Sequence, residues 1–355
     1  MDRPDLSKLD PQIRAYIEML ESELEQLKRT GIVKKPSKSP EIQIETEGEI
    51  FELTEPNEPP TTINIITATA SGVIKRTPRH FYTRQKRGGM GIFDLETPEE
   101  DPPILLAEAD ESQSILFLTD HGRAFQLPLL GIPESPVRSK GLSILSKLNL
   151  ANDEQLAVVT PIQAHGYLAV VSQRGFVRLL RHHIFGEYMK PGTQILDPRT
   201  NGMLSAVCWT GGEGDLFIAT RSGKAIRFAE KLVAPGGTQG IRLDGADQCI
   251  AIAAVDDDSL VFLLGADGKG TVRFMENFNA NKSPNAGGKV AMNTDQLIAA
   301  RTIQEKDDIF IISQLSKIIR FRAEEVPPKD GVVQGVVCMS LRADNPAAVI
   351  SSTIK

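Results

Sequence analysis

One short stretch of the chain concentrates positive charge. Between Ile63 and Phe93 there are six basic side chains and no acidic one, so the stretch carries a local charge of +6. The basic residues are Lys75, Arg76, Arg79, Arg84, Lys86 and Arg87. Lysine and arginine donate hydrogen bonds to phosphate oxygens, and arginine can do so through two nitrogens at once. This density of cations indicates binding of a polyphosphate such as a nucleic acid.

The basic stretch ends in the glycine-rich segment QKRGGMG, from Gln85 to Gly91. Glycine allows a backbone to approach a duplex closely and leaves its N–H groups free to donate to phosphates. Such binding gains most of its free energy from counterion release, so it depends steeply on salt and little on base sequence. The competing interpretation is a glycine-rich strap between repeats, with charges that are only solvated.

The elements that would hold these residues form a repeat of six units. Each unit has an apolar β-rich run, a short polar turn, a second apolar run with a basic residue, and a loop with glycine. The turn positions are 45–53 residues apart: Gly72, Gly122, Gly175, Gly223, Gly268 and Ser316. A second glycine follows 17–20 residues later: Gly91, Gly141, Gly192, Gly240, Gly288 and Gly335. Because tight hairpin turns need positive φ angles, we expect the serine turn to differ or to be slightly strained.

The length of the units predicts the fold. About 49 residues per unit is enough for four strands, and a sheet of that size cannot bury both faces by itself. Radial stacking of six such sheets covers the faces and protects the edges. We therefore predict an all-β fold, a six-bladed propeller or pinwheel disc of four-stranded blades spanning residues 62–355.

The chain before the first unit has a different character. Apolar residues recur there at spacings of three and four: Ile13, Ile17, Leu20, Leu24 and Leu27. This period predicts an amphipathic helix within residues 1–31, which either packs on its own domain or forms a short coiled coil in a homodimer. Residues 32–61 are rich in proline and glutamate, which predicts an acidic linker. The linker either competes with a polyanion for the basic residues or is a solvated spacer.

A second set of cations recurs with the repeat. Five arginines follow their hairpin turns by three to five residues: Arg76, Arg178, Arg227, Arg273 and Arg320. The second unit has Gln126 instead. Alternation with apolar neighbours predicts that these arginines lie on the exposed edges of the blades. There they either contact a polyanion around the rim or prevent sheet-to-sheet aggregation.

Charge and composition narrow the class of protein to which the chain can belong. The net charge of −6 arises within residues 1–62, which carry 8 basic and 14 acidic side chains, so the repeat region is neutral overall. No apolar run approaches the roughly 20 residues of a membrane helix, and no signal segment is present, which predicts a cytoplasmic protein. Three cysteines in apolar runs, Cys208, Cys249 and Cys338, predict buried free thiols.

The segment from Gln85 to Gly91 resembles the signature box of the DNA gyrase A C-terminal domain, in which glutamine, two basic residues, two glycines, a basic residue and glycine follow one another. Met90 departs from that pattern, because a basic residue is usual there. The blocks SGVIKRTP, SGKAIRF and QGVVCMSLRADN extend the resemblance over about residues 62–355. The family implies a six-bladed β-pinwheel, here expected as a free-standing protein, that wraps duplex DNA around a basic rim.

The resemblance also implies which residues bind DNA. The box residues carried over by position are Gln85, Lys86, Arg87, Gly88, Gly89 and Gly91. The basic stretch and the recurring arginines, independently of the resemblance, predict further contacts on the rim from Lys75, Arg76, Arg79, Arg84, Arg178, Arg227, Arg273 and Arg320. Because Met90 removes one charge from the box, wrapping is expected to be weaker than in the family. Bending would cost about 1–6 kcal/mol per 20–30 base pairs.

No motif predicts an enzyme. The family cleaves DNA with a tyrosine on a separate N-terminal domain, whereas the four tyrosines here lie on the predicted helix or in the blades. We therefore expect no strand cleavage and no ATP use, and we predict no metal or other cofactor. The leading hypothesis is non-specific binding and bending of double-stranded DNA, with the protein assisting a topoisomerase or acting as an architectural, nucleoid-associated factor. The alternative is a propeller scaffold for protein–protein interaction that has lost DNA wrapping.

Overall fold

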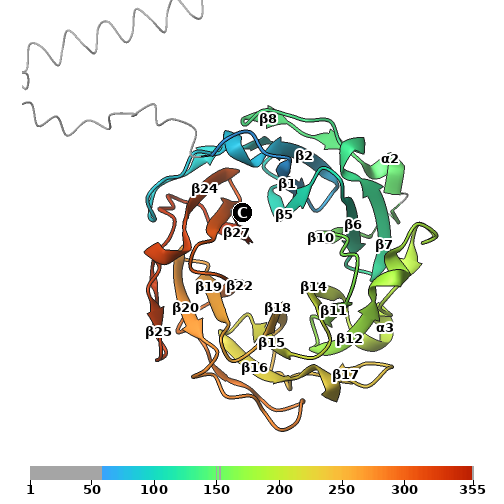
Figure 1. Ribbon diagram of the computed structural model, residues 1–355, viewed down its shortest axis with the longest axis vertical. Coiled ribbons are helices and arrows are strands. Elements are labelled where there is room, and N and C mark those ends of the chain that lie inside the picture. The colour runs from blue at the N-terminus through green and yellow to red at the C-terminus, as the bar shows by residue number, and fades with distance from the viewer. Residues whose placement is uncertain (1–57, 149, 152, 354–355) are drawn as a thin grey trace, which may run out of the picture. The chain divides into compact units, whose positions relative to one another are not determined.

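Each of the six sequence units forms an antiparallel β-hairpin (Figure 1). The computed structural model describes residues 58–148, 150–151 and 153–353, and these belong to one compact unit. The helix predicted within residues 1–31, and the predicted linker up to residue 57, lie outside the described residues. The hairpins are β1 (Ile63–Thr69) with β2 (Val73–Pro78), β6 (Ser114–Thr119) with β7 (Arg123–Pro128), β11 (Tyr167–Ser172) with β12 (Phe176–Arg181), β15 (Asp215–Thr220) with β16 (Lys224–Ala229), β19 (Leu260–Gly265) with β20 (Lys269–Phe274), and β23 (Asp308–Ser313) with β24 (Lys317–Arg322).

A third strand completes the inner side of each hairpin. The inner strands, in the order of blades 1 to 6, are β5 (Pro103–Asp110), β10 (Leu156–Pro161), β14 (Leu204–Thr210), β18 (Cys249–Val255), β22 (Leu297–Ile303) and β27 (Pro346–Ser352). Neighbouring inner strands contact one another around the whole circle, including β27 with β5. The six blades therefore form a closed ring, as predicted.

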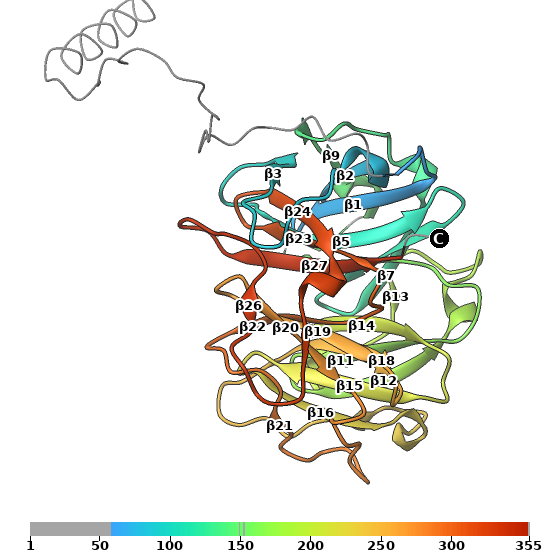
Figure 2. The same ribbon diagram turned by 60° about the vertical axis from the view of Figure 1, so that its left-hand side comes forward.

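The outermost strand of each blade comes from a different unit than its hairpin. In blades 1 to 5 the outer strands are β9 (Leu142–Ser143), β13 (Thr193–Gln194), β17 (Thr238–Gln239), β21 (Lys289–Val290), and β25 (Pro328–Lys329) with β26 (Val336–Val337), each from the next unit. Blade 6 receives β3 (Ile92–Phe93) from the first unit, and Figure 2 shows β3 beside β24. Sequence analysis did not predict this exchange, through which the first unit closes the ring.

Short elements connect hairpins to outer strands. A parallel bridge joins β4 (Leu95–Glu96) to β8 (Ser139–Lys140). The single-turn helices are α2 (Leu145–Leu148), α3 (Pro198–Asn201) and the 3-10 turns η1 (Arg79–Phe81), η2 (Leu129–Gly131), η3 (His182–Phe185), η4 (Glu230–Leu232) and η5 (Ala323–Glu325). Among the described residues, none of these helices has the length and apolarity needed to cross a bilayer.

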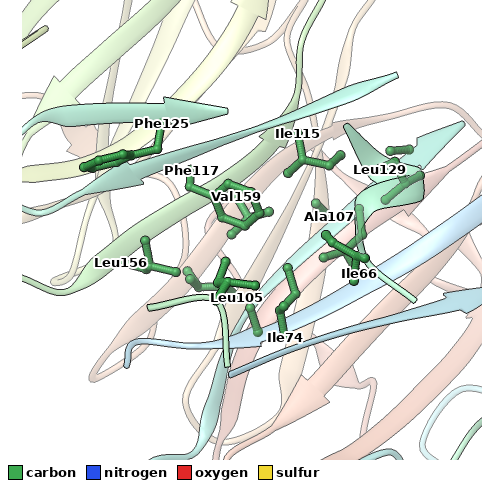
Figure 3. Packing of buried hydrophobic residues seen from close by; sticks show 14 of the residues in the cluster. Ile66, Ile74, Leu105, Ala107, Ile115, Phe117, Phe125, Leu129, Leu156 and Val159 are labelled. Carbon is green, nitrogen blue, oxygen red and sulfur yellow. The ribbon is translucent and has the colours of Figure 1, made fainter. Parts of the chain in front are cut away.

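The cores lie between neighbouring blades. Figure 3 shows Ile66 and Leu105 of blade 1 packed with Phe117 and Val159 of blade 2, all of them buried. Because each sheet is covered on both faces, its central strands are continuous apolar runs, and all six residues of β23 are buried. Cys249 and Cys338 are buried free thiols and Cys208 is a partly buried one, so the prediction of free thiols is confirmed and full burial holds for two of the three.

The turn positions follow the predicted register with one difference. Ser316 has a φ angle of 61°, in the region that favours glycine, so the expected unusual turn is confirmed. Its hydroxyl accepts a hydrogen bond from Leu95 N at 2.8 Å, which no glycine could do. In the fourth unit, Gly237, with φ of 102°, precedes the outer strand as Gly91 does in the first. Gly237 and not Gly240 is therefore the equivalent second glycine.

Candidate nucleic-acid interface

The box segment lies on blade 6, although it belongs to the first unit. Gln85 N donates to Arg320 O at 2.7 Å, and Gly88 N donates to Cys338 O at 2.9 Å. The segment then continues into β3 at the outer edge of β24. The box is thus a strap between blades as well as a carrier of charge, so the two interpretations of the sequence are compatible.

This packing requires glycine at position 91 and crowds Gly89, whose nearest neighbour is a flexible side chain. A Cβ atom on Gly91 would lie 2.7 Å from Ile318 O, and one on Gly89 would lie 2.9 Å from Gln85 Oε1. The sequence prediction explained the glycines by close approach to a ligand. The contacts explain these two by close approach to blade 6 and to the box itself.

Arg87 is half-buried and connects the box to the strap of blade 5. Its backbone N donates to Glu325 Oε2 at 2.8 Å, and its guanidinium donates through Nε to Glu325 O at 3.0 Å and through Nη1 to Val337 O at 2.6 Å. Nη2 makes no hydrogen bond to the described residues. The guanidinium forms no ion pair with any described carboxylate, and one nitrogen remains for a phosphate.

Lys86 is exposed and makes no ion pair with any residue that the structure describes. Met90, four residues further on, is 41% exposed. The box thus presents one free ammonium group, one partly engaged guanidinium, and an apolar side chain where the family carries a third charge.

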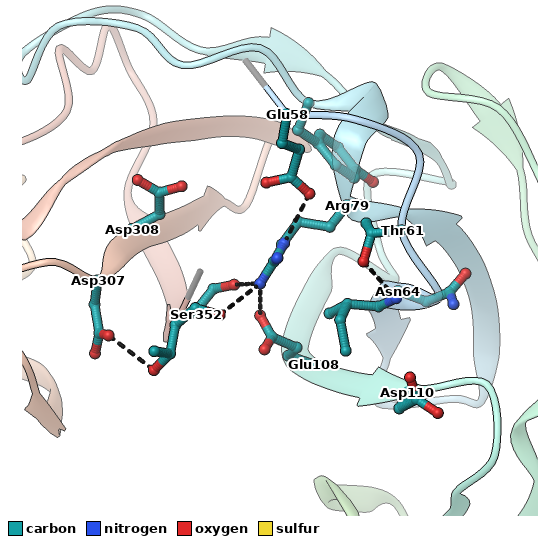
Figure 4. A network of polar contacts seen from close by, with 12 residues as sticks. Glu58, Thr61, Asn64, Arg79, Glu108, Asp110, Asp307, Asp308 and Ser352 are labelled. Carbon is teal, nitrogen blue, oxygen red and sulfur yellow. Dashed lines mark hydrogen bonds and ion pairs between the residues drawn. The ribbon is translucent and has the colours of Figure 1, made fainter. Parts of the chain in front are cut away.

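Two arginines of the basic stretch and one of the recurring hairpin arginines form ion pairs within the protein. Arg79 Nε lies 3.0 Å from Glu58 Oε1, and Figure 4 shows its guanidinium between Glu58 and Ser352. Arg84 Nε lies 2.8 Å from the buried carboxylate of Asp308. Arg320 Nη2 lies 2.6 Å from the same carboxylate. Arg79 and Arg84 join the first unit to blade 6, and Arg320 adds to the same junction by donating through Nη1 to Tyr82 O at 2.9 Å.

Lys75 is fully buried. Its Nζ lies 2.5 Å from Asp94 Oδ1, which also accepts a hydrogen bond from the Tyr82 hydroxyl at 2.8 Å. Burial lowers the pKa of Lys75, and the Asp94 carboxylate opposes that shift only in part. The expectation that Lys75 lies at the surface is wrong, because the segment after the box covers Lys75 and places Asp94 against its ammonium group.

The ring of exposed arginines predicted from alternation is also wrong for four of its five members. The exposed fractions of Arg76, Arg227, Arg273 and Arg320 are only 2–6%. Alternation places them correctly on one face of each strand, but that face is covered by neighbouring blades and by the segments that lead from each hairpin to the next outer strand. Arg178 is half-buried, and its Nη1 donates to Ile195 O at 3.0 Å.

The buried arginines have internal partners. Arg76 pairs with Glu111 at 3.1 Å, and Arg227 pairs with Asp215 at 2.7 Å and with Asp257 at 2.6 Å. Arg273 donates through Nη1 to Gly331 O. Guanidiniums held in this way stabilise junctions between blades and have little donor surface left for DNA.

Exposed lysines on the straps form a set that sequence analysis missed. We define the outer straps as residues 79–93, 129–143, 182–194, 230–239, 275–290 and 323–337. Each strap carries at least one exposed lysine: Lys86, Lys140, Lys190, Lys231, Lys282 and Lys329. The signal was available, because each lysine precedes the second glycine of its unit. Five straps also contain acidic residues, whereas residues 79–93 contain none.

Comparison with known proteins establishes the family. A profile of the DNA gyrase C-terminal domain, beta-propeller, matches residues 64–101, 113–163, 214–264 and 307–344, about half of the chain. The chain belongs to this family. The predicted resemblance is therefore confirmed, and the region of gyrase to which the chain is similar is the non-catalytic C-terminal domain.

Individual relatives agree with this assignment. The chain is 26% identical to the DNA gyrase A protein of Staphylococcus epidermidis over 291 residues, which cover 78% of the chain and 33% of the relative. It is also 26% identical to the Staphylococcus aureus protein over 294 residues, which cover 79% of the chain and 33% of the relative. The chain therefore spans about a third of the length of these curated relatives.

Two solved structures share the fold. The structure of the DNA gyrase A C-terminal domain matches with a TM-score of 0.72 and 16% identity, over 82% of this chain and all of that one. The crystal structure of the C-terminal domain of DNA topoisomerase IV matches with a TM-score of 0.58 and 20% identity, over 82% of this chain and 93% of that one.

Proposed function

We propose that the six-bladed ring binds duplex DNA non-specifically along its outer straps and bends it, with the box strap of blade 6 as the principal contact. The observation that carries this proposal is Lys86, an exposed and unpaired cation on the only strap whose sequence contains no acidic residue. Membership of the gyrase C-terminal domain family supports the choice of DNA as the polyanion.

The straps supply a physical route for bending. Lys86 and Nη2 of Arg87 pair with backbone phosphates, and the exposed lysines of the following straps offer further contacts around the circumference. Each phosphate neutralised releases counterions, and the sum of these contacts opposes the elastic cost of about 1–6 kcal/mol for bending 20–30 base pairs. The buried arginines contribute by keeping the straps in place.

Two uses of the bent complex share this chemistry. In one, the ring presents curved DNA to a type II topoisomerase; in the other, it acts as an architectural component of the nucleoid. Similarity to domains of gyrase and topoisomerase IV favours the first. Homodimerisation through the N-terminal segment and nucleoid location stay predictions.

A gel-shift salt titration tests DNA binding. We expect wild type to retard long duplex at about 50 mM salt, and Lys86→Ala to lower the slope of log affinity against log salt by about 0.9. Lys306→Ala is the matched control, because Lys306 is also exposed but lies outside the straps, between β22 and β23. Equal effects of the two variants would reject the box as the principal contact.

Bending is tested separately by ligation. A nicked plasmid is bound, sealed and deproteinised, and the change in linking number is compared between wild type and Lys86→Ala. Absence of retardation by wild type would reject the DNA function and leave the protein-interaction scaffold as the better account. Retardation without a change in linking number would retain DNA binding but reject wrapping.

A further inference from the structure

The inner strands of all six blades line a narrow central channel. Its walls are mostly alanine, valine and isoleucine side chains, including those of Ile104, Val158, Ala206 and Ile252. One adjoining cavity, lined by Leu106, Val158 and Val207 among others, has a volume of about 240 Å³. Arg301 of β22 lines both spaces.

Arg301 lies in the inner strand of blade 5, and the other five blades have no charged residue at the equivalent position. In blade 5, Arg301 of the inner strand pairs with Phe262 of the hairpin. In each of the other five blades, the inner-strand residue that pairs with the hairpin position equivalent to Phe262 can be identified in the same way. Those residues are Ala107, Thr160, Cys208, Ala253 and Ile350. None of them is charged, so the ring can be built at this level without a cation.

The guanidinium of Arg301 also lacks the carboxylate partners that Arg76, Arg227 and Arg320 have. Its Nε donates to Val349 O at 3.3 Å, and within the described residues it forms no ion pair and no other hydrogen bond. Arg227, by contrast, lies between two carboxylates and also donates to two carbonyl oxygens. Burial lowers the pKa of Arg301, and among the described residues only the Cys208 thiol, whose own pKa burial raises to about 12, opposes this shift.

Arg301 is half-buried at the wall of the channel and has no counter-charge among the described residues, so an anion in the channel would supply one. We propose that the central channel binds a small oxyanion of the phosphate class through the guanidinium of Arg301. The forked geometry of the guanidinium suits two oxygens of such an ion. Glu108 lines the same cavity, but Arg79 Nη1 lies 3.6 Å from its carboxylate and opposes its negative charge.

This site is distinct from the straps, so its test does not use DNA. Inorganic phosphate is titrated into the full chain by calorimetry at constant ionic strength, and thermal unfolding is followed in parallel. We expect one phosphate per chain and an unfolding temperature that rises with phosphate. Arg301→Met should weaken binding by about tenfold or more and abolish the rise. Arg181→Met, at an exposed arginine of β12, should change neither.

The two variants distinguish phosphate binding in the channel from phosphate binding to any positively charged surface. Equal phosphate stabilisation of wild type and Arg301→Met would overturn the proposal, as would loss of binding in Arg181→Met or the absence of binding to wild type. Without phosphate, Arg301→Met should be at least as stable as wild type, since it removes an unpaired interior charge. If Arg301→Met does not fold, Arg301→Lys must still bind phosphate, and failure of that folded variant to bind would equally overturn the proposal.

Discussion

Glu58 Oε2 lies 2.6 Å from Arg320 Nη2, although the two residues are 262 positions apart in the sequence. The other oxygen of Glu58 lies 3.0 Å from Arg79 Nε. One buried carboxylate therefore joins blade 1 to blade 6. Sequence analysis placed Glu58 in a solvated or DNA-competing linker, and for this glutamate both alternatives are wrong, because the ring junction buries it between two cations.

Glu58→Gln should destabilise the ring. The substitution leaves Arg79 and Arg320 without their shared carboxylate, and breaking a buried ion pair from one side typically costs about 3–5 kcal/mol. The free energy of unfolding, measured in urea, checks this. Glu305→Gln is the control, because Glu305 is exposed and outside the junction, and it should change stability by less than about 0.5 kcal/mol. Similar values for both variants would contradict the junction role.

The contribution of Glu58 should also depend on pH. Burial acts to raise its pKa, but the hydrogen bonds and charges of Arg320 and Arg79 outweigh burial and hold the pKa below its usual value of 4.5. Its stabilisation is therefore fully present above pH 4.5 and is lost as the pH falls through the folded-state pKa. The difference in unfolding free energy between wild type and Glu58→Gln should shrink in acid. A difference that stays constant down to about pH 3 would show that the carboxylate charge is not responsible.

Arg227→Ala should affect stability and not DNA binding. Its guanidinium is 3% exposed and lies between Asp215 and Asp257, so its removal should cost about 3–5 kcal/mol. Lys231→Ala, four residues further on at an exposed site, should leave stability unchanged but lower the salt slope of DNA binding by about 0.9. Urea unfolding and gel shifts on both folded variants would decide. If folded Arg227→Ala bound DNA more weakly than wild type while Lys231→Ala bound it as wild type does, the arginines would be DNA contacts on the rim after all.

Met90→Lys should strengthen DNA binding. Met90 is 41% exposed, so a lysine fits there without repacking and restores a basic residue to the box. The salt slope should become steeper by about 0.9, as expected for one more neutralised phosphate. Met203→Lys adds the same charge at a side chain that is 40% exposed but lies before β14, outside the straps. A gain of equal size in both would mean that only net charge matters.

Gly91→Ala should loosen the box strap. Gly91 has a φ angle of 72°, and a Cβ atom there would lie 2.7 Å from Ile318 O, a backbone atom that cannot rotate away. We expect a loss of about 2–4 kcal/mol in unfolding free energy, together with faster amide exchange in β3. Gly131→Ala meets no atom within 4 Å and is the control. Unchanged exchange in β3 would indicate that the strap has another anchor.

Much of the fold was predictable because it is local. Apolar runs and turn residues such as Gly72 identify each hairpin, and the absence of glycine at Ser316 correctly signalled an unusual turn. The exchange of outer strands was not predictable, since a strand of two residues such as β3 has no periodicity to detect.

The candidate site was predicted only in part. Alternation indicates that Arg227 and Phe228 point to opposite faces of a strand, but it does not reveal what covers each face, and here a neighbouring blade covers the arginine. Arg320 pairs with Asp308 of its own hairpin, but its other partner, Glu58, is 262 positions away, so the burial of Arg320 between them had no local signal. Lys86 was identified because the box motif is contiguous, and the other strap lysines could have been found from the second-glycine register.

The strap that closes the ring has a consequence for the order of assembly. The box is made before the other five units of the ring, and its anchor at Glu325 is 238 positions later than Arg87. A growing chain on the ribosome can complete its intermediate blades one after another, while the box waits for the final hairpin to emerge. Arg84 and Arg87 therefore gain their partners Asp308 and Glu325 only after the last hairpin of the ring has been made, so we expect the box to be the last part of the ring to order.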